Sequence, residues 1–139
     1  MTAIDTNVLV DLLANVDAAL QQRAYGVLEA SARRGPLFIA PIVHAELGAN
    51  PAFSIETFDR FLLESRIRVD WKLSEQIWRV AGMKFAHYAR RRRASRGGEP
   101  RRLIADFVIG AHATAVGGLV TRDAAFYRRE FADLAIFEP

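Results

Sequence analysis

Four acidic residues lie within or beside apolar stretches of the sequence, at positions where an α/β fold would bring them together. A carboxylate that is buried alone becomes protonated or finds a partner, and several crowded carboxylates need a cation. Oxygen ligands without thiolates select Mg²⁺ or Mn²⁺ over zinc or copper, and such a metal can activate a water and neutralise a phosphoryl oxygen. The candidate metal ligands and catalytic residues are Asp5, Glu46, Asp106 and Asp123.

Short apolar segments alternate with stretches of helical periodicity, a pattern that predicts an α/β protein. The strands are expected at residues 3–4, 37–40, 67–69, 119–121 and 134–136. Helices are expected at 8–13, between Asp17 and Gly35, from Pro41 to before Pro51, after Ser54, from Ser74 into an arginine-rich stretch, at 103–115 and at 123–129.

Strands separated by helices pair in parallel and carry helices on both faces. We therefore expect one domain over residues 1–139, with a central, mostly parallel sheet of four to five short strands. The ligand crevice of such a sheet lies beyond the carboxyl ends of its strands, and Asp5 and Asp123 each follow a strand directly. Thr6, Asn7 and Thr121 could supply hydrogen bonds that orient the carboxylates.

Each acid also has a structural interpretation. The two that follow strands could be helix caps, since aspartate is favoured at that position. Glu46 could be a solvated helix residue. Asp106, which stands between apolar residues, could be held in an ion pair with Arg101 or Arg102. The four together are much harder to explain in this way.

The net charge of +3 conceals a strongly basic segment at residues 90–102, where seven arginines face a single acid, Glu99. This segment could be a solvated face, an arm that binds RNA phosphates, or a docking site for an acidic partner. The candidate RNA-binding residues are Arg90, Arg91, Arg92, Arg93, Arg96, Arg101 and Arg102.

Composition excludes several classes of site and protein. The chain has no cysteine, so disulfides, thiolate-bound zinc and a thiol nucleophile are ruled out. The first residues lack the basic start and apolar core of a signal peptide, and the longest apolar run contains Asp106 and His112. We therefore expect a cytoplasmic protein without a membrane span.

The remaining aromatic and histidine residues favour structural roles. His44, His87 and His112 form no ligand set, and core or surface positions suit them better. A stripe on the long helix, made of Trp78, Phe85 and Tyr88, is more typical of a core than of a base-stacking surface. Phe58 and Phe61 are expected to face inward, or else to line a groove for a partner helix.

Four fragments give the chain a resemblance to PIN-domain nucleases, and specifically to the VapC-like ribonuclease toxins of toxin–antitoxin pairs. Residues 4–9 (Ile-Asp-Thr-Asn-Val-Leu) are similar to the opening motif of that family, and residues 121–123 (Thr-Arg-Asp) to its closing motif. Residues 45–47 contribute Glu46 and residues 103–106 contribute Asp106, the two acids that lie between these motifs in the sequence. The resemblance covers essentially the whole chain, although the basic segment is longer than the family leads us to expect.

The resemblance implies metal-dependent hydrolysis of RNA that leaves a 5′-phosphate, with Mg²⁺ or Mn²⁺ held by the four acids. On this view Asp5 and Asp106 are the indispensable ligands, while Asp123 and Glu46 shape a second metal position or orient water. Thr121 and Asn7 are the supporting polar residues. The implied partners are an RNA substrate, a cognate antitoxin and a second copy of the chain in a homodimer.

Rival functions are weaker on the same residues. A haloacid-dehalogenase-like phosphotransferase needs an aspartate where Asn7 stands, and a receiver domain needs a lysine beside its acids, a place that Lys72 and Lys84 do not fit. The serious alternative is a non-catalytic RNA- or protein-binding module that keeps the fold and uses the arginine-rich segment. The two differ in whether cleavage or stability depends on a divalent metal.

Overall fold

Five short parallel strands form the sheet at the centre of the computed structural model, which describes residues 1–14, 17–95 and 101–139. The strand order is β3-β2-β1-β4-β5, and every neighbouring pair is parallel. The sequence prediction of an α/β fold with a parallel sheet is confirmed. The strands are β1 (Thr2–Ile4), β2 (Leu37–Ile39), β3 (Arg68–Val69), β4 (Leu119–Val120) and β5 (Ile136–Phe137).

Helices separate the strands and begin where the sequence provides caps. The Asp17 side chain accepts the backbone N–H groups of Ala19 and Leu20, and the Ser54 hydroxyl accepts that of Thr57. Within the described ranges the helices are α1 (Thr6–Leu13), α2 (Ala18–Arg34), α3 (Pro41–Gly48), α4 (Ile55–Ser65), α5 (Glu75–Ala94), α6 (Ile104–Val116) and α7 (Ala124–Glu130).

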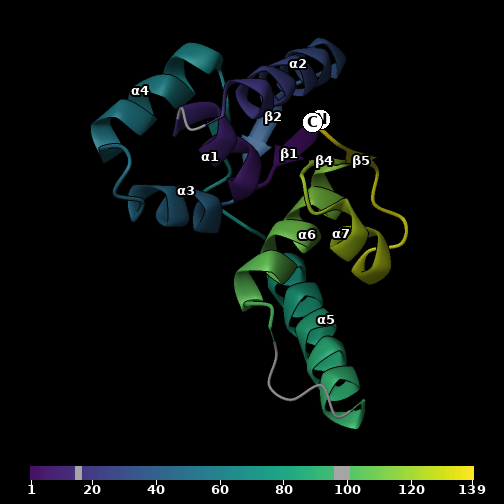
Figure 1. Cartoon of the computed structure of the whole chain (residues 1–139). Helices are drawn as coiled ribbons and strands as arrows, with labels where there is room; N and C mark the ends of the chain where they lie inside the picture. The colour runs from purple at the N-terminus through teal and green to yellow at the C-terminus, as the bar shows by residue number, and fades with distance from the viewer. Residues whose placement is uncertain (15–16, 96–100) are drawn as a thin grey trace.

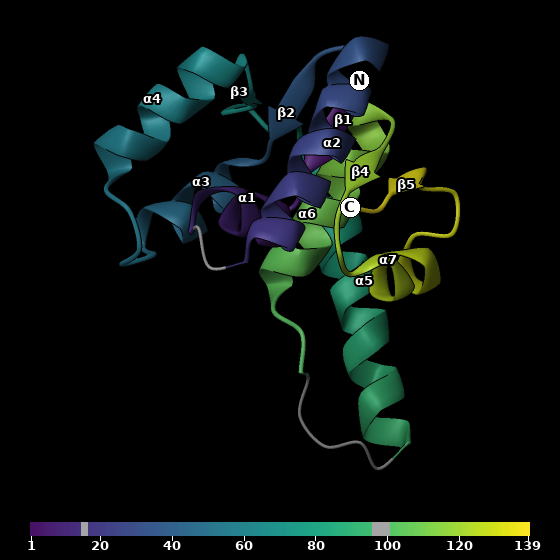
Figure 2. The same cartoon turned by 45° about the horizontal axis from the view of Figure 1, so that its top comes forward.

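The helices cover both faces of the sheet, as Figures 1 and 2 show from two directions. Helix α2 lies above the strands in Figure 1, and α6 lies below them with α5 packed along it. The outer end of α5 projects beyond the rest of the molecule (Figure 1). The arginines of residues 90–93 are therefore carried on a protruding helix end.

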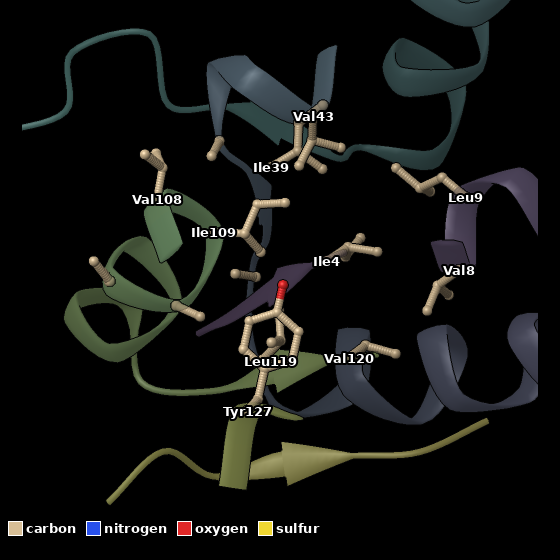
Figure 3. Close-up of a cluster of buried hydrophobic side chains, with 14 of the residues drawn as sticks. Ile4, Val8, Leu9, Ile39, Val43, Val108, Ile109, Leu119, Val120 and Tyr127 are labelled. Carbon is tan, nitrogen blue, oxygen red and sulfur yellow. The ribbon is translucent and has the colours of Figure 1, made fainter. Parts of the chain in front are cut away.

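Aliphatic side chains from the strands meet those of the helices in the core drawn in Figure 3. Ile4, Ile39 and Val120 are fully buried, and so are Leu9 from α1 and Val43 from α3. Such burial stabilises the fold by roughly 1.5–3 kcal/mol for each large aliphatic side chain. It also fixes the ends of β1 and β4, from which Asp5 and Thr121 emerge.

Two details of the sequence prediction were wrong. Trp78 is 54% exposed, because it lies about 100° around α5 from the buried stripe that includes Ile77. The last strand is Ile136–Phe137 and not residues 134–136, because Leu134 still belongs to a turn in which its N–H donates to the Phe131 carbonyl. The expectation that Phe58 faces inward is confirmed, since its side chain is fully buried.

No helix in the described part of the chain is both long enough and apolar enough to span a membrane.

Gly110 on α6 has no room for a side chain, because a Cβ atom there would overlap the ring of buried Phe131. We expect Gly110→Ala to lower the free energy of unfolding by about 1–3 kcal/mol. Gly82→Ala is the matched control, since nothing lies within 4 Å of its Cβ position and alanine favours a helix by up to about 1 kcal/mol. Urea denaturation would measure both. A Gly110→Ala protein as stable as Gly82→Ala would contradict this packing.

Candidate active site

All four predicted acids line one open pocket of about 380 Å³. Asp5 directly follows β1, Asp123 is the third residue after β4, Glu46 comes from α3, and Asp106 comes from the first turn of α6. The pocket thus lies beyond the carboxyl ends of the central strands, where the sheet topology predicts a ligand site. Its lining residues are Asp5, Thr6, Asn7, Val10, Glu46, Arg102, Asp106, Ile109, Arg122 and Asp123.

Asp5 is buried and held by two side chains. Its Oδ2 accepts hydrogen bonds from the Thr121 hydroxyl at 2.6 Å and from Asn7 Nδ2 at 2.8 Å. Asp5 occupies the residue before α1, but its side chain makes no capping hydrogen bond. The carboxylate therefore points into the pocket instead of satisfying the helix end, which removes the simplest structural explanation for this aspartate.

Thr121 connects the ends of the two central strands. Its hydroxyl donates to Asp5 and accepts the backbone N–H of Asp123 at 2.9 Å. Asn7 uses its other amide atom, Oδ1, to accept the backbone N–H of Arg122 at 3.2 Å. The predicted supporting residues thus lie beside the acids, and they fix the backbone on both sides of the pocket.

Glu46 and Asp123 already have partners. The Thr6 hydroxyl donates to Glu46 Oε2, and the Arg102 guanidinium forms an ion pair with Asp123 Oδ2. Asp123, like Asp5, precedes a helix without capping it through its side chain. Asp106 accepts the backbone N–H of Leu103 at 3.1 Å. The ion pair of Arg102 is therefore with Asp123, whereas the sequence alternative placed it on Asp106.

Burial and repulsion between carboxylates make Asp5 and Asp106 costly to ionise. Burial is the main cause that raises the pKa of Asp5 to about 6, and the negative charges of Asp106 and Glu46 add to it, while the Thr121 hydrogen bond opposes it. Burial also raises the pKa of Asp106, with a further contribution from Asp123 and opposition from Arg102. The buried Tyr127 hydroxyl has its pKa raised by burial and by three of these acids.

The donor set suits a hard divalent cation, although its arrangement is not a closed coordination shell. In residues 1–14, 17–95 and 101–139, no three Asp, Glu or His side chains are arranged to hold a metal ion as they stand. Two of the four acids are engaged by Thr6 and Arg102. All four carboxylates nevertheless line the same pocket.

Most of the predicted RNA-binding arginines lie outside this pocket. Arg102 alone among the described ones lines it. Arg91 forms a bidentate contact with the buried carboxylate of Glu130, at 2.7 and 2.6 Å. Arg90, Arg92, Arg93 and Arg101 do not line the pocket, and Arg96 lies outside the described residues.

One basic residue of the pocket was missed by the sequence prediction. Arg122 lines the rim and pairs through Nε with Asp11 at 2.7 Å. The signal was present, because Arg122 stands inside the closing motif between Thr121 and Asp123. Its partner could not be found in the same way, since Asp11 lies more than a hundred residues away on α1.

The comparisons with known proteins agree with the fold. The family model described as "PIN domain" matches residues 2–132. No curated protein matches the sequence. Among solved structures, VapBC2 from Rickettsia felis, bound to a DNA fragment from its promoter, shares 22% identity over 99% of this chain and 97% of its own, with a TM-score of 0.65.

Two further structures are similar to the same extent. A toxin–antitoxin complex from Klebsiella pneumoniae has 22% identity over 99% of this chain and 96% of its own, with a TM-score of 0.63. VapBC-1 from nontypeable Haemophilus influenzae has 23% identity over the same shares, with a TM-score of 0.64. At this level of identity these likenesses show the fold.

The raised pKa of Asp5 predicts how stability depends on pH in metal-free protein. The folded state holds this proton up to about pH 6, whereas the unfolded chain releases it near the ordinary value of 3.8. Stability is therefore lost as pH rises between these values, by on the order of 2–3 kcal/mol. We expect Asp5→Asn to stabilise the protein at pH 7 and to have little effect at pH 4.

Urea denaturation in the presence of a chelator at both pH values would measure this difference. The exposed Asp133→Asn variant is the control, and its effect should be small at both values. An Asp5→Asn effect of equal size at pH 4 and pH 7 would show that the Asp5 carboxyl titrates normally.

Proposed function

Because the chain belongs to the PIN domain family, we propose that it is a metal-dependent endoribonuclease and the toxin of a toxin–antitoxin pair. The observation that carries this proposal is the shared pocket of Asp5, Glu46, Asp106 and Asp123. These residues are far apart in the sequence, and apart from Arg102 on Asp123 no ion pair to them is found in the described ranges. Keeping four carboxylates ionised in one pocket costs free energy unless a cation occupies the pocket.

Mg²⁺ or Mn²⁺ is the expected cation, with Asp5 and Asp106 as its principal ligands and Asp123 and Glu46 completing the site. When bound, the metal would lower the pKa of the attacking water and neutralise charge on the phosphate. The all-oxygen donor set supports this choice, as does the open pocket, because Mg²⁺ keeps several of its waters and needs room for them.

The protein's own side chains hold and orient the reacting groups. Thr121 and Asn7 fix the Asp5 carboxylate through two hydrogen bonds to its Oδ2, at the wall of the pocket. Glu46, oriented by Thr6, can accept a proton from the attacking water at its carboxylate. Arg122 stands on the rim, where its guanidinium can contact the RNA backbone.

Two partners follow from the same assignment. A groove of about 220 Å³, lined mainly by apolar side chains of α1, α2 and α4 such as Leu12, Leu28 and Phe61, is suited to an apolar helix of a cognate antitoxin. We also propose that the protein forms a homodimer. A cytoplasmic location follows from the proposed substrate, which would be cellular RNA.

A non-catalytic RNA- or protein-binding module on the same fold is the alternative. It is favoured by the ion pair between Arg102 and Asp123 and by the lack of three converged carboxylates in the described residues. Metal titration separates the two functions. The alternative requires that neither cleavage nor stability respond to Mg²⁺ or Mn²⁺.

We expect Asp106→Asn to abolish metal-dependent RNA cleavage, with a loss of at least about 100-fold, because a carboxylate ligand contributes several kcal/mol. The protein should remain folded, since Asp106 is half-exposed and an asparagine oxygen can still accept the Leu103 N–H. Cleavage of total cellular RNA with and without Mn²⁺, followed by mapping of the fragment ends, measures the effect. The control is Asp133→Asn, and cleavage by Asp106→Asn at the control's rate would show that the site is misassigned.

The outer end of α5 tests whether its arginines bind RNA. Arg90→Gln with Arg93→Gln removes two exposed charges and leaves the Arg91–Glu130 pair intact. In an inactive Asp106→Asn background, we expect weaker RNA binding and a slope of log K against log[salt] reduced by about 1–1.5. A matched pair on α2, Arg23→Gln with Arg33→Gln, should change the slope less. If the α5 pair weakens antitoxin binding only, these arginines serve the partner protein and not RNA.

A further inference from the structure

Arg102 brings the arginine-rich segment into the acidic pocket. Its guanidinium forms the ion pair with Asp123, and its Cζ atom lies 4.4 Å from the centre of the Phe126 ring. The side chain is about one-third exposed, as is that of Asp123. A cation is thus already present at one of the four acids, held from one side by charge and from the other by a ring face.

The backbone on both sides of Arg102 is hydrogen-bonded to the rest of the protein. The preceding residue, Arg101, donates its N–H to the Tyr88 hydroxyl at 3.2 Å. The following residue, Leu103, donates its N–H to Asp106 at 3.1 Å. Because both neighbours are anchored, Arg102 stays beside the pocket whether or not its guanidinium contacts Asp123.

A divalent cation and a guanidinium compete for the oxygens of one carboxylate when both approach it closely. The charge of Arg102 also acts on Asp106, since each of the two residues perturbs the ionisation of the other. Two positive charges a few ångströms apart repel, and this repulsion is only partly screened in a half-buried pocket. Metal binding at Asp123 must therefore displace the guanidinium or overcome its repulsion.

We propose that Arg102 is an internal competitor of the metal ion: it neutralises Asp123 in the metal-free protein and must leave that carboxylate before a divalent cation can bind there. This role rests on the proposed metal site and deepens it. Arg102 then sets the metal concentration at which the site fills, and it prevents the empty pocket from carrying four uncompensated acids. It acts through Asp123 and touches no reacting atom.

Removal of the competing charge should tighten metal binding. We expect Arg102→Gln to bind Mn²⁺ about three- to tenfold more tightly than wild type, the range that corresponds to a partly exposed ion pair of roughly 1 kcal/mol. Isothermal titration of chelator-treated protein with MnCl₂, without RNA, measures the affinity. The Mn²⁺ concentration for half-maximal RNA cleavage should fall by a similar factor.

Arg128→Gln is the matched control, because it also removes one arginine that pairs with an acid, Glu138, but it does not line the pocket. Its Mn²⁺ affinity should stay within about twofold of wild type. In an Asp123→Asn background, Arg102→Gln should tighten binding much less, since the carboxylate for which the two cations compete is gone.

The outcomes separate this inference from the proposed function. Equal or weaker Mn²⁺ affinity in folded Arg102→Gln, with wild type binding Mn²⁺, would overturn the competition and leave the metal site standing. Equal tightening in Arg128→Gln would assign the effect to net charge and would also overturn it. Absence of saturable Mn²⁺ binding by wild type would contradict the metal site itself, and the competition with it.

Discussion

The electrostatic cost of gathering four carboxylates, one of them buried, in a single pocket is the constraint on which this structure depends. Parallel pairing of β1 with β4 aligns Ile4 with Val120, so the two chain segments that follow, with Asp5 and Thr121, emerge side by side. The packed side chains of Ile4, Leu9 and Val120 prevent either segment from moving away. The acids therefore share a pocket because the core requires it, and the protein has to meet the electrostatic cost locally.

Three features of the protein lower the electrostatic cost of the clustered carboxylates without a metal. Hydroxyl and amide groups donate to the carboxylates, as Thr121 and Asn7 do to Asp5. Protonation is favoured, since the pKa of Asp5 is raised to about 6. Arg102 supplies a positive charge at Asp123. Each feature is reversible, so the same groups can give way to a stronger counter-ion, which is what a binding site for a divalent cation requires.

The sequence was sufficient for the fold and for the position of the acids. In a parallel sheet, a carboxylate directly after an apolar strand, as at Asp5, lies at the carboxyl edge of the sheet. Asp106, near the start of an apolar helix, faces the same edge. Membership of the PIN domain family and the parallel α/β architecture were thus predicted correctly. The catalytic roles of these acids, and the choice of metal, remain predictions.

Partner choice could not be predicted from the sequence, because it depends on distances between elements. Arg102 is four residues from Asp106 in the sequence but forms its ion pair with Asp123. Arg91 forms an ion pair with Glu130 on α7. The prediction from helical periodicity that Trp78 is buried failed for a similar reason, since the width of the packed stripe on α5 is set by α6.

The most direct test of a shared metal pocket is anomalous diffraction at the manganese edge from crystals of wild-type protein soaked in MnCl₂. The account predicts a peak about 2–2.3 Å from carboxylate oxygens of Asp5 and Asp106, and a pocket without a peak at saturating Mn²⁺ would contradict it.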